Sequence, residues 1–275
     1  MHIAHSPATL TPLLEQYRRH QGGRSAISLV TTRGDLHDGH GAVINAAATV
    51  SDHVVVAKFP VTMPSAHNVI SASEFQDISF SDQHRADIVY APSIEYLYPD
   101  GVDQASLVSL SEPLTHLEYD PVALTTHLKI INAVQPDIMV WGERNFIEYM
   151  QVRRLIEELD LQTQMHCIPT VRHANGVAVS GHDEAFMQQH PDAAPTIYET
   201  LKDAAHAIRS GASNYANVER TAKIALKGAG YNVAYFCILD DVSLMAADST
   251  TSSFRIVCRL ELQEFNLVDC LSLTL

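Results

Sequence analysis

Residues 26–57, with the sequence AISLVTTRGDLHDGHGAVINAAATVSDHVVVA, contain the clearest indication of the fold class. It begins with a β-rich run over 26–30, passes through a glycine-containing turn, and continues as an alanine-rich helical segment over 40–50. A second apolar run follows over 52–57. Strand, turn, helix and strand in this order predict a βαβ unit with parallel strands and a right-handed crossover.

The same alternation of strands and helices continues as far as residue 170. The further elements that we expect are a helix over 10–20, a strand over 87–92, a helix over 121–134, a strand over 137–141, a helix over 146–159 and a strand over 161–170. The last of these helices is amphipathic, with Met150, Leu155 and Leu159 on its inner face. We therefore predict an α/β fold with an open parallel sheet, in which ligands bind beyond the carboxyl ends of the strands.

From about residue 171 the pattern changes. Two helical stretches over 193–210 and 215–229 precede two β-like runs over 233–239 and 253–260. This order is typical of an α+β domain. We expect a first domain over residues 1–170 and a smaller α+β domain over residues 171–275.

Composition and charge exclude several classes of protein. The chain has 275 residues, of which 46% are hydrophobic, and Lys+Arg 18 against Asp+Glu 32 gives a net charge of −14. Such a field repels phosphate backbones, so we expect no nucleic-acid partner. No apolar run approaches the ~20 residues of a membrane span, so we expect no membrane partner, and the first residues lack the pattern of a secretory signal. Four widely spaced cysteines predict reduced core thiols in a cytoplasmic protein.

The segment His37-Asp38-Gly39-His40 lies where the first predicted strand leads into the first helix. The N–H groups at a helix N-terminus attract anions, glycine allows close backbone approach, and imidazoles can bind phosphate oxygens. A histidine donor directed at a transferring phosphoryl group stabilises the transition state more than the ground state. The pattern predicts a phosphate site. The alternatives are polar decoration of a turn and a two-histidine metal site, although no third metal ligand is apparent.

Several spaced motifs resemble those of the pantothenate synthetase (pantoate–β-alanine ligase) family, within the HIGH-type nucleotidyltransferase superfamily. Residues 31–40 resemble its pattern PTMGxLHxGH, and residues 90–101 resemble APSxExxYPxG. Similar stretches follow in the family's order at 134–137 with 142–146, at 169–172 with 176–180, and at 267–270. The resemblance covers nearly the whole chain.

This resemblance implies a Rossmann-like nucleotide-binding domain, a C-terminal lid domain and a homodimer. It implies an ATP-dependent ligase that activates a small carboxylic acid as an acyl-adenylate, releases pyrophosphate, and joins the acyl group to a small amine, with Mg²⁺ accompanying the triphosphate. By resemblance, His40, His37 and Arg144 would be catalytic. The residues that would bind ATP are Arg33, Gly34, His37, Gly39, His40, Gly142, Arg144, Asn145, Val171, Val179, Ser180 and His182.

The chain departs from the family pattern mainly at the expected site. Arg33 replaces a methionine, and Pro64 and Glu148 stand where the family has two pantoate-binding glutamines. These three positions form the expected acid-binding set. Arg144 and Asn145 replace a lysine and an aspartate, and Ser180-Gly181-His182-Asp183 stands where the family has SSRN. A site built to pair with hydroxyl groups discriminates strongly, so rebuilding it predicts a different acid.

Three functions are therefore open. The first is a divergent ligase acting on an acid other than pantoate. The second is a catalytically impaired paralogue that binds a nucleotide or a partner. The third is a true pantoate–β-alanine ligase with unusual site residues.

Several individual residues can also be explained by a structural role alone. Arg33 and Glu148 can form a structural salt bridge, and Trp141 can be a core residue. Two further explanations of this kind are surface positions for the histidines His173, His182 and His190, and a strand end at Asp240-Asp241.

Overall fold

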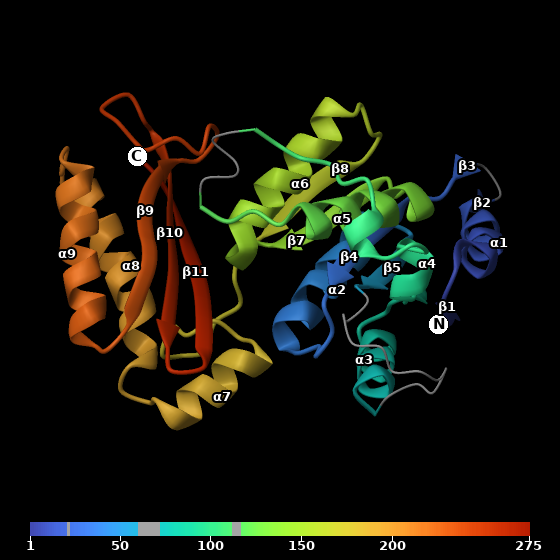
Figure 1. The fold of residues 1–275 in the computed structure, drawn as a ribbon, viewed down its shortest axis with the longest axis horizontal. Coiled ribbons are helices and arrows are strands. Elements are labelled where there is room, and N and C mark those ends of the chain that lie inside the picture. Colours follow the sequence, from blue (N-terminus) through green and yellow to red (C-terminus); the bar gives the residue numbers. More distant parts are fainter. Residues whose placement is uncertain (21–22, 60–71, 112–116) are drawn as a thin grey trace. The chain divides into compact units, whose positions relative to one another are not determined.

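The computed structural model describes residues 1–20, 23–59, 72–111 and 117–275 (Figure 1). Their contacts divide the chain into two compact units. The first unit consists of residues 1–110, 120–142 and 149–168, and the second of residues 111–119, 143–148 and 169–275. The domain boundary expected near residue 170 stays a prediction, and two short earlier segments group with the second unit.

A parallel sheet forms the centre of the first unit, with strand order β1-β6-β5-β4-β7-β8. The strands are β1 (His2–Ala4), β4 (Ile27–Thr32), β5 (His53–Lys58), β6 (Ile88–Tyr90), β7 (Ile138–Gly142) and β8 (Gln164–Ile168). The chain leaves β4 toward β5 on one side, and β7 joins it on the other. In open α/β sheets, ligands generally bind beyond the carboxyl ends of the strands at such a reversal of strand order, which here lies at β4. The predicted α/β class with a Rossmann-like parallel sheet is confirmed.

Helices connect these strands. They are α1 (Pro7–Arg18), α2 (Asp38–Val50), α3 (Ala72–Gln83), α4 (Ile94–Leu97), α5 (Pro121–Val134) and α6 (Phe146–Glu158), with the 3-10 turn η1 (Val102–Gln104) and the short pair β2 (Arg19–His20) and β3 (Gly23–Arg24). The first helix starts earlier than expected because Ser6 caps it, its side chain accepting from Thr9 N–H. Leu159 was predicted to face inward, but α6 ends before it and the side chain is exposed.

Three aspartates fix the amino-terminal edge of this sheet. The carboxylates of Asp52, Asp87 and Asp137 each accept a hydrogen bond, at 2.8–2.9 Å, from a backbone N–H at or near the start of a neighbouring strand. The buried side chains of the central strands and of α2 form the core above this edge. The part of the candidate site that belongs to the first unit lies at the opposite, carboxyl edge of the sheet.

The second unit contains a three-stranded antiparallel sheet, in the order β11-β10-β9. Its elements are η2 (Glu143–Asn145), α7 (Gly181–Gln189), α8 (Ala194–Arg209), α9 (Tyr215–Gly228), β9 (Asn232–Asp240), β10 (Ser253–Leu262) and β11 (Phe265–Thr274). Helices α8 and α9 pack against one another and against this sheet (Figure 1). Buried apolar side chains of these helices and strands form the core of the second unit. Strand β11 and helix α7 were not predicted, although the alternating burial of β11 at Phe265, Leu267 and Leu273 follows an apolar pattern in the sequence.

Each of the four cysteines, all within the described part of the chain, is a thiol and not half of a disulfide. Cys258 and Cys270 are buried in the second unit as expected, and Cys237 is half-buried. Cys167 lies on the edge strand β8 and is exposed, so the reading of all four as core thiols is wrong for this residue.

Candidate functional site

The turn between β4 and α2 brings the two motif histidines together. His37 is the N-cap of α2, and its Nδ1 accepts a hydrogen bond from Gly39 N–H at 3.1 Å. This bond leaves the proton of the neutral His37 ring on Nε2. The His37 and His40 ring centroids lie 4.0 Å apart, so both imidazoles sit at the positive end of α2.

Thr32 and Gly34 shape the start of this turn. The Thr32 hydroxyl accepts from Gly34 N–H at 3.1 Å, and its Oγ1 lies 3.2 Å from His40 Nε2. Gly34 has a φ of +97°, which favours glycine. Arg33 is exposed, and its guanidinium carbon lies 5.9 Å from the ring centroid of Phe59. The structure therefore gathers Arg33, Gly34, His37, Gly39 and His40 in one turn, which we call the phosphate turn (residues 32–40).

A buried ion pair supports the phosphate turn. Lys58, the last residue of β5, binds Asp77 on α3 with 2.6 Å between Nζ and Oδ2. The other Asp77 oxygen accepts from Leu36 N–H at 2.8 Å. A Cβ atom at Gly34 would lie 2.8 Å from Lys58 Cε, so the lysine stem fills the space beside that glycine. This ion pair was not predicted from the sequence. A lysine at the end of a buried strand is unusual, and this was the signal that could have indicated the pair.

A group of aromatic rings lies near the carboxyl edge of the sheet, next to the phosphate turn. The His127 ring on α5 lies 4.5 Å from the Phe59 ring and 5.1 Å from the Trp141 ring, between ring centroids. Trp141 is a buried residue of β7, which agrees with its interpretation as a core residue. His127 is also buried and was not considered from the sequence.

The segment after β7 belongs to the second unit. Gly142 ends β7, and residues 143–145, which we call loop 143–145, form the turn η2. Arg144 is half-buried, and its Nε donates to the carbonyl oxygen of Val268 on β11 at 2.9 Å. Asn145 is exposed. Arg144, one of the expected nucleotide-binding residues, is therefore attached to the antiparallel sheet.

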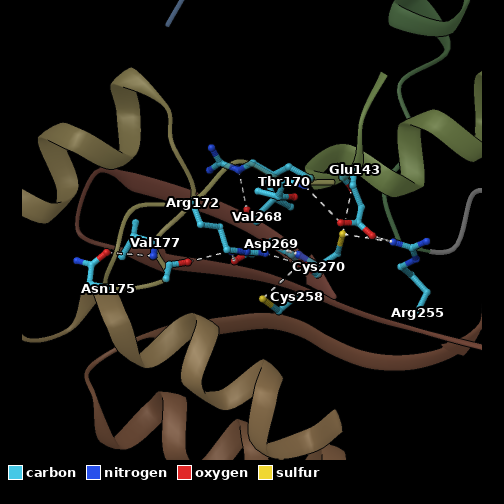
Figure 2. A network of polar contacts seen from close by, with 12 residues as sticks. Glu143, Thr170, Arg172, Asn175, Val177, Arg255, Cys258, Val268, Asp269 and Cys270 are labelled. Carbon is cyan, nitrogen blue, oxygen red and sulfur yellow. Dashed lines mark hydrogen bonds and ion pairs between the residues drawn. The ribbon is translucent and has the colours of Figure 1, made fainter. Parts of the chain in front are cut away.

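Glu143 joins loop 143–145 to several other segments of the second unit (Figure 2). Its carboxylate binds Arg255 on β10 and accepts from Thr170 N–H at 3.4 Å. Its carbonyl oxygen accepts from the Cys270 thiol at 3.0 Å. Sequence reasoning missed Arg255 and Cys270 as partners because more than 110 residues separate them from the loop.

A second network in Figure 2 anchors the lid segment, residues 170–180. Arg172 forms a two-pronged pair with Asp269, at 2.7 and 2.8 Å, and stacks on Tyr198 with 4.1 Å to its ring centroid. Burial lowers the pKa of Arg172, but its bonds to Asp269 outweigh this and hold the pKa above its ordinary value. The guanidinium is therefore permanently charged and fixes the segment on β11.

The lid segment folds back on itself. Val179 N–H donates to the Val171 carbonyl oxygen at 2.9 Å, so these two predicted site residues lie side by side. Val171 is exposed, Val179 is half-buried, and Ser180 is buried just before α7. The backbone of His182 lies in α7, and the structure does not describe its side chain. Pro64 lies outside the described residues.

The remaining predictions have mixed outcomes. His173 and His190 are half-buried, and His190 packs on Phe186, so neither is a plain surface histidine. Asp240 ends β9, which agrees with its interpretation as a strand end. Arg33 belongs to the first unit and the half-buried Glu148 to the second, so their pairing stays a prediction.

Comparison with known proteins matches residues 2–272 to the family described as pantoate-beta-alanine ligase. The chain belongs to this family. A pantothenate synthetase of Methylococcus capsulatus is 30% identical over 280 residues, covering 98% of this chain and 96% of the relative. One of Pseudomonas aeruginosa is 31% identical over 271 residues, covering 94% of each. The predicted family is therefore confirmed.

Solved structures show the same fold. A pantothenate synthetase from Thermus thermophilus superimposes with a TM-score of 0.83 at 23% identity, covering 98% of this chain and 99% of that chain. A pantoate-beta-alanine ligase from Francisella tularensis, complexed with β,γ-ATP and β-alanine, gives 0.73 at 19% identity over 98% and 97%. Members of the pantoate-β-alanine ligase family are ATP-dependent carbon–nitrogen ligases, and the predicted enzyme class is confirmed. Among the helices of the described residues, none has the length and apolar character of a membrane span.

Proposed function

We propose that this chain uses ATP to activate a small carboxylic acid and joins it to a small amine, and that the acid differs from pantoate. The observation that carries the ligase function is the phosphate turn, in which two imidazoles 4.0 Å apart sit at the N-terminus of α2. The acid carboxylate attacks the α-phosphorus, pyrophosphate leaves, and an acyl-adenylate forms. The amine then attacks the acyl carbon and AMP leaves.

His37 and His40 supply hydrogen-bond donors to the phosphates in this proposal. The proton on His37 Nε2 is directed away from the backbone bond made by Nδ1, which suits it to a phosphate oxygen. His40 is placed by Thr32, which also bonds to Gly34 N–H. Donors placed in advance require no reorganisation when negative charge develops on the leaving pyrophosphate.

ATP is further bound by loop 143–145 and the lid segment in this proposal. Arg144 and Asn145 contact the nucleotide from the loop, and Val171, Val179, Ser180 and His182 contact it from the lid segment. The anchoring of both segments on β11 by Arg144 and Arg172 supports this assignment, because anchored backbone holds a ligand at a smaller entropic cost.

Mg²⁺ would arrive with the triphosphate. Within the described ranges, no three His, Cys, Asp or Glu side chains gather in a metal-binding cluster. This fits the usual behaviour of Mg²⁺, which keeps several waters and is held largely by substrate phosphates. Bound in that way it would neutralise charge on the triphosphate.

The altered acid is supported by the charges at the expected acid-binding positions. Arg33 lies on the phosphate turn and Glu148 in the first turn of α6, while Pro64 completes the expected set. A carboxylate facing a neutral diol without a partner is costly, whereas a charged or strongly polar acid can pair with it. The assignment of an amino acid or hydroxy acid as substrate rests on this chemistry.

An impaired nucleotide-binding paralogue is the second candidate. It is favoured by Ser180-Gly181-His182, where a permanently charged arginine of the family pattern is replaced by histidine. A homodimer and a cytoplasmic location remain predictions for either candidate.

Calorimetry with Mg·ATP tests the proposed function. We expect binding at millimolar ATP or tighter, weakened by His40→Ala. Absence of nucleotide binding would contradict both the ligase and the paralogue. Binding without any acid-dependent pyrophosphate exchange would favour the paralogue.

A further inference from the structure

The antiparallel sheet holds loop 143–145 through contacts with Glu143 (Figure 2). Arg255 on β10 binds the Glu143 carboxylate, and its guanidinium carbon lies 3.6 Å from the Phe146 ring centroid. Cys270 on β11 donates its thiol to the Glu143 carbonyl oxygen at 3.0 Å. One residue therefore fixes the Glu143 side chain and the other its backbone.

We propose that Arg255 and Cys270 are positioning residues that hold loop 143–145 in the conformation that binds nucleotide. This rests on the proposed function, in which Arg144 and Asn145 of the loop contact ATP. Arg255 and Cys270 act through Glu143, the residue directly before Arg144.

Arg255 suits this role because it joins separate segments. Its Nε binds Asp241 at 2.8 Å, just after β9, while its Nη1 binds Glu143 in the loop. The side chain is only 8% exposed. Burial lowers the pKa of Arg255, but the surrounding acidic groups outweigh it and hold the pKa above its ordinary value. The guanidinium therefore stays charged, and its removal leaves the Glu143 and Asp241 carboxylates without this cation.

Cys270 suits the role as a neutral donor. Burial raises the pKa of its thiol, so the thiol keeps its proton. The Cys270 backbone N–H is itself held by Asp269 at 2.8 Å, which also binds Arg172 of the lid segment. The donor thus stands on a rigid part of β11.

The Glu143 carboxylate extends the effect to the lid segment. While one of its oxygens binds Arg255, the other accepts from Thr170 N–H, the first residue of that segment. Displacing Glu143 therefore disturbs both segments that we propose to contact ATP.

Two matched pairs of variants test the proposal. Cys270→Ala removes the thiol bond to the loop, whereas Cys258→Ala removes a buried thiol that donates to the Asp269 carbonyl oxygen on β11 and does not touch the loop. Arg255→Met is compared with Arg255→Lys and with Arg259→Met, whose arginine lies on the same strand and pairs with Glu118. The readouts are KM for ATP, kcat, and amide hydrogen exchange of residues 143–146 without nucleotide.

We expect Cys270→Ala to raise KM for ATP about fivefold, as for one lost neutral hydrogen bond. Arg255→Met should raise it at least about tenfold, and Arg255→Lys should recover part of that loss. Both Cys270→Ala and Arg255→Met should speed amide exchange of residues 143–146 while exchange in β10 is unchanged. The two controls should leave KM and loop exchange at wild-type values.

A fall in melting temperature with unchanged KM and unchanged loop exchange would overturn the proposal, because that is the result of a purely structural role. If the wild-type chain fails to bind ATP, the proposed function fails instead, and loop exchange still decides whether Arg255 and Cys270 position the loop. If Arg255→Met does not fold, the two cysteine variants give the answer.

Discussion

The phosphate turn and loop 143–145 are held in different ways. In the turn, local hydrogen bonds of His37, His40 and Gly34 join residues 32–40 to one another. In the loop, Glu143 binds Thr170 of the lid segment, and Glu143 and Arg144 also bind β10 and β11, more than 110 residues away in the sequence. A segment held by its own neighbours can be recognised from a short motif, whereas a segment held by distant strands needs the fold to be known first.

The largest expected effect is on the histidines of the turn. His40→Gln should lower acid-dependent pyrophosphate exchange by about 10²–10³-fold, because removing one donor directed at developing charge has that cost. Affinity for Mg·ATP should fall less. His53→Gln is the control, since His53 begins β5 at the opposite edge of the sheet. Full exchange activity in His40→Gln would contradict the role of the turn.

The next largest effect is expected at the ion pair of Lys58 and Asp77, which supports the phosphate turn from outside residues 32–40. Asp77→Asn removes the charge that balances the buried Lys58, and removing one partner of such a pair costs about 3 kcal/mol of unfolding free energy. Urea unfolding measures it, and the double variant Lys58→Met with Asp77→Asn should recover part of the loss. A loss below about 1 kcal/mol would show that the pair contributes little to holding the turn.

The acid-binding positions have a smaller expected effect. Arg33→Met and Glu148→Gln restore the family residues, and each should lower kcat/KM for the native acid about tenfold, or about 1.4 kcal/mol, with little change in melting temperature. If both variants keep full activity and lower the melting temperature together, the two residues form a structural pair instead.

The smallest effect is expected in a local turn of the second unit. Asp240 accepts from the backbone N–H and the hydroxyl of Ser243, each at 2.8 Å, and these bonds lower the pKa of Asp240. The stabilisation is therefore present above the ordinary carboxyl pKa and is lost as pH falls through the lower, folded-state pKa. Ser243→Ala should cost about 0.3 kcal/mol at pH 7, a small value because the carboxylate is solvated.

That cost should shrink near pH 3, where the unfolded carboxyl is mostly protonated. Urea unfolding at the two pH values measures the difference. An equal loss at both would show that Ser243 acts independently of the charge on Asp240, and that the local turn is not held in the way described.

Most of the parallel sheet was predictable because its strands are continuous apolar runs between helices with apolar periodicity. The expected helix over 121–134 coincides with α5, and the phosphate turn was correctly placed between the strand ending at Thr32 and α2. The short edge strand β1 was missed, since three residues paired to β6 carry no periodic signal.

The site was less predictable than the fold. Lys58 with Asp77, His127 with its aromatic neighbours, and Arg255 with Glu143 were all missed. Each of these contacts joins residues that are separated along the chain and that local periodicity cannot relate. The motif identified which residues belong to the turn and the loop, but not what holds them there.

Pyrophosphate exchange with a panel of small carboxylic acids tests the central claim most directly. The assay contains the purified chain, Mg·ATP, labelled pyrophosphate and one acid at a time: amino acids, hydroxy acids and pantoate. We expect exchange that depends on a charged or strongly polar acid, is much slower with pantoate, and is abolished by His40→Ala. Rapid exchange with pantoate, or no exchange with any acid despite ATP binding, would contradict it.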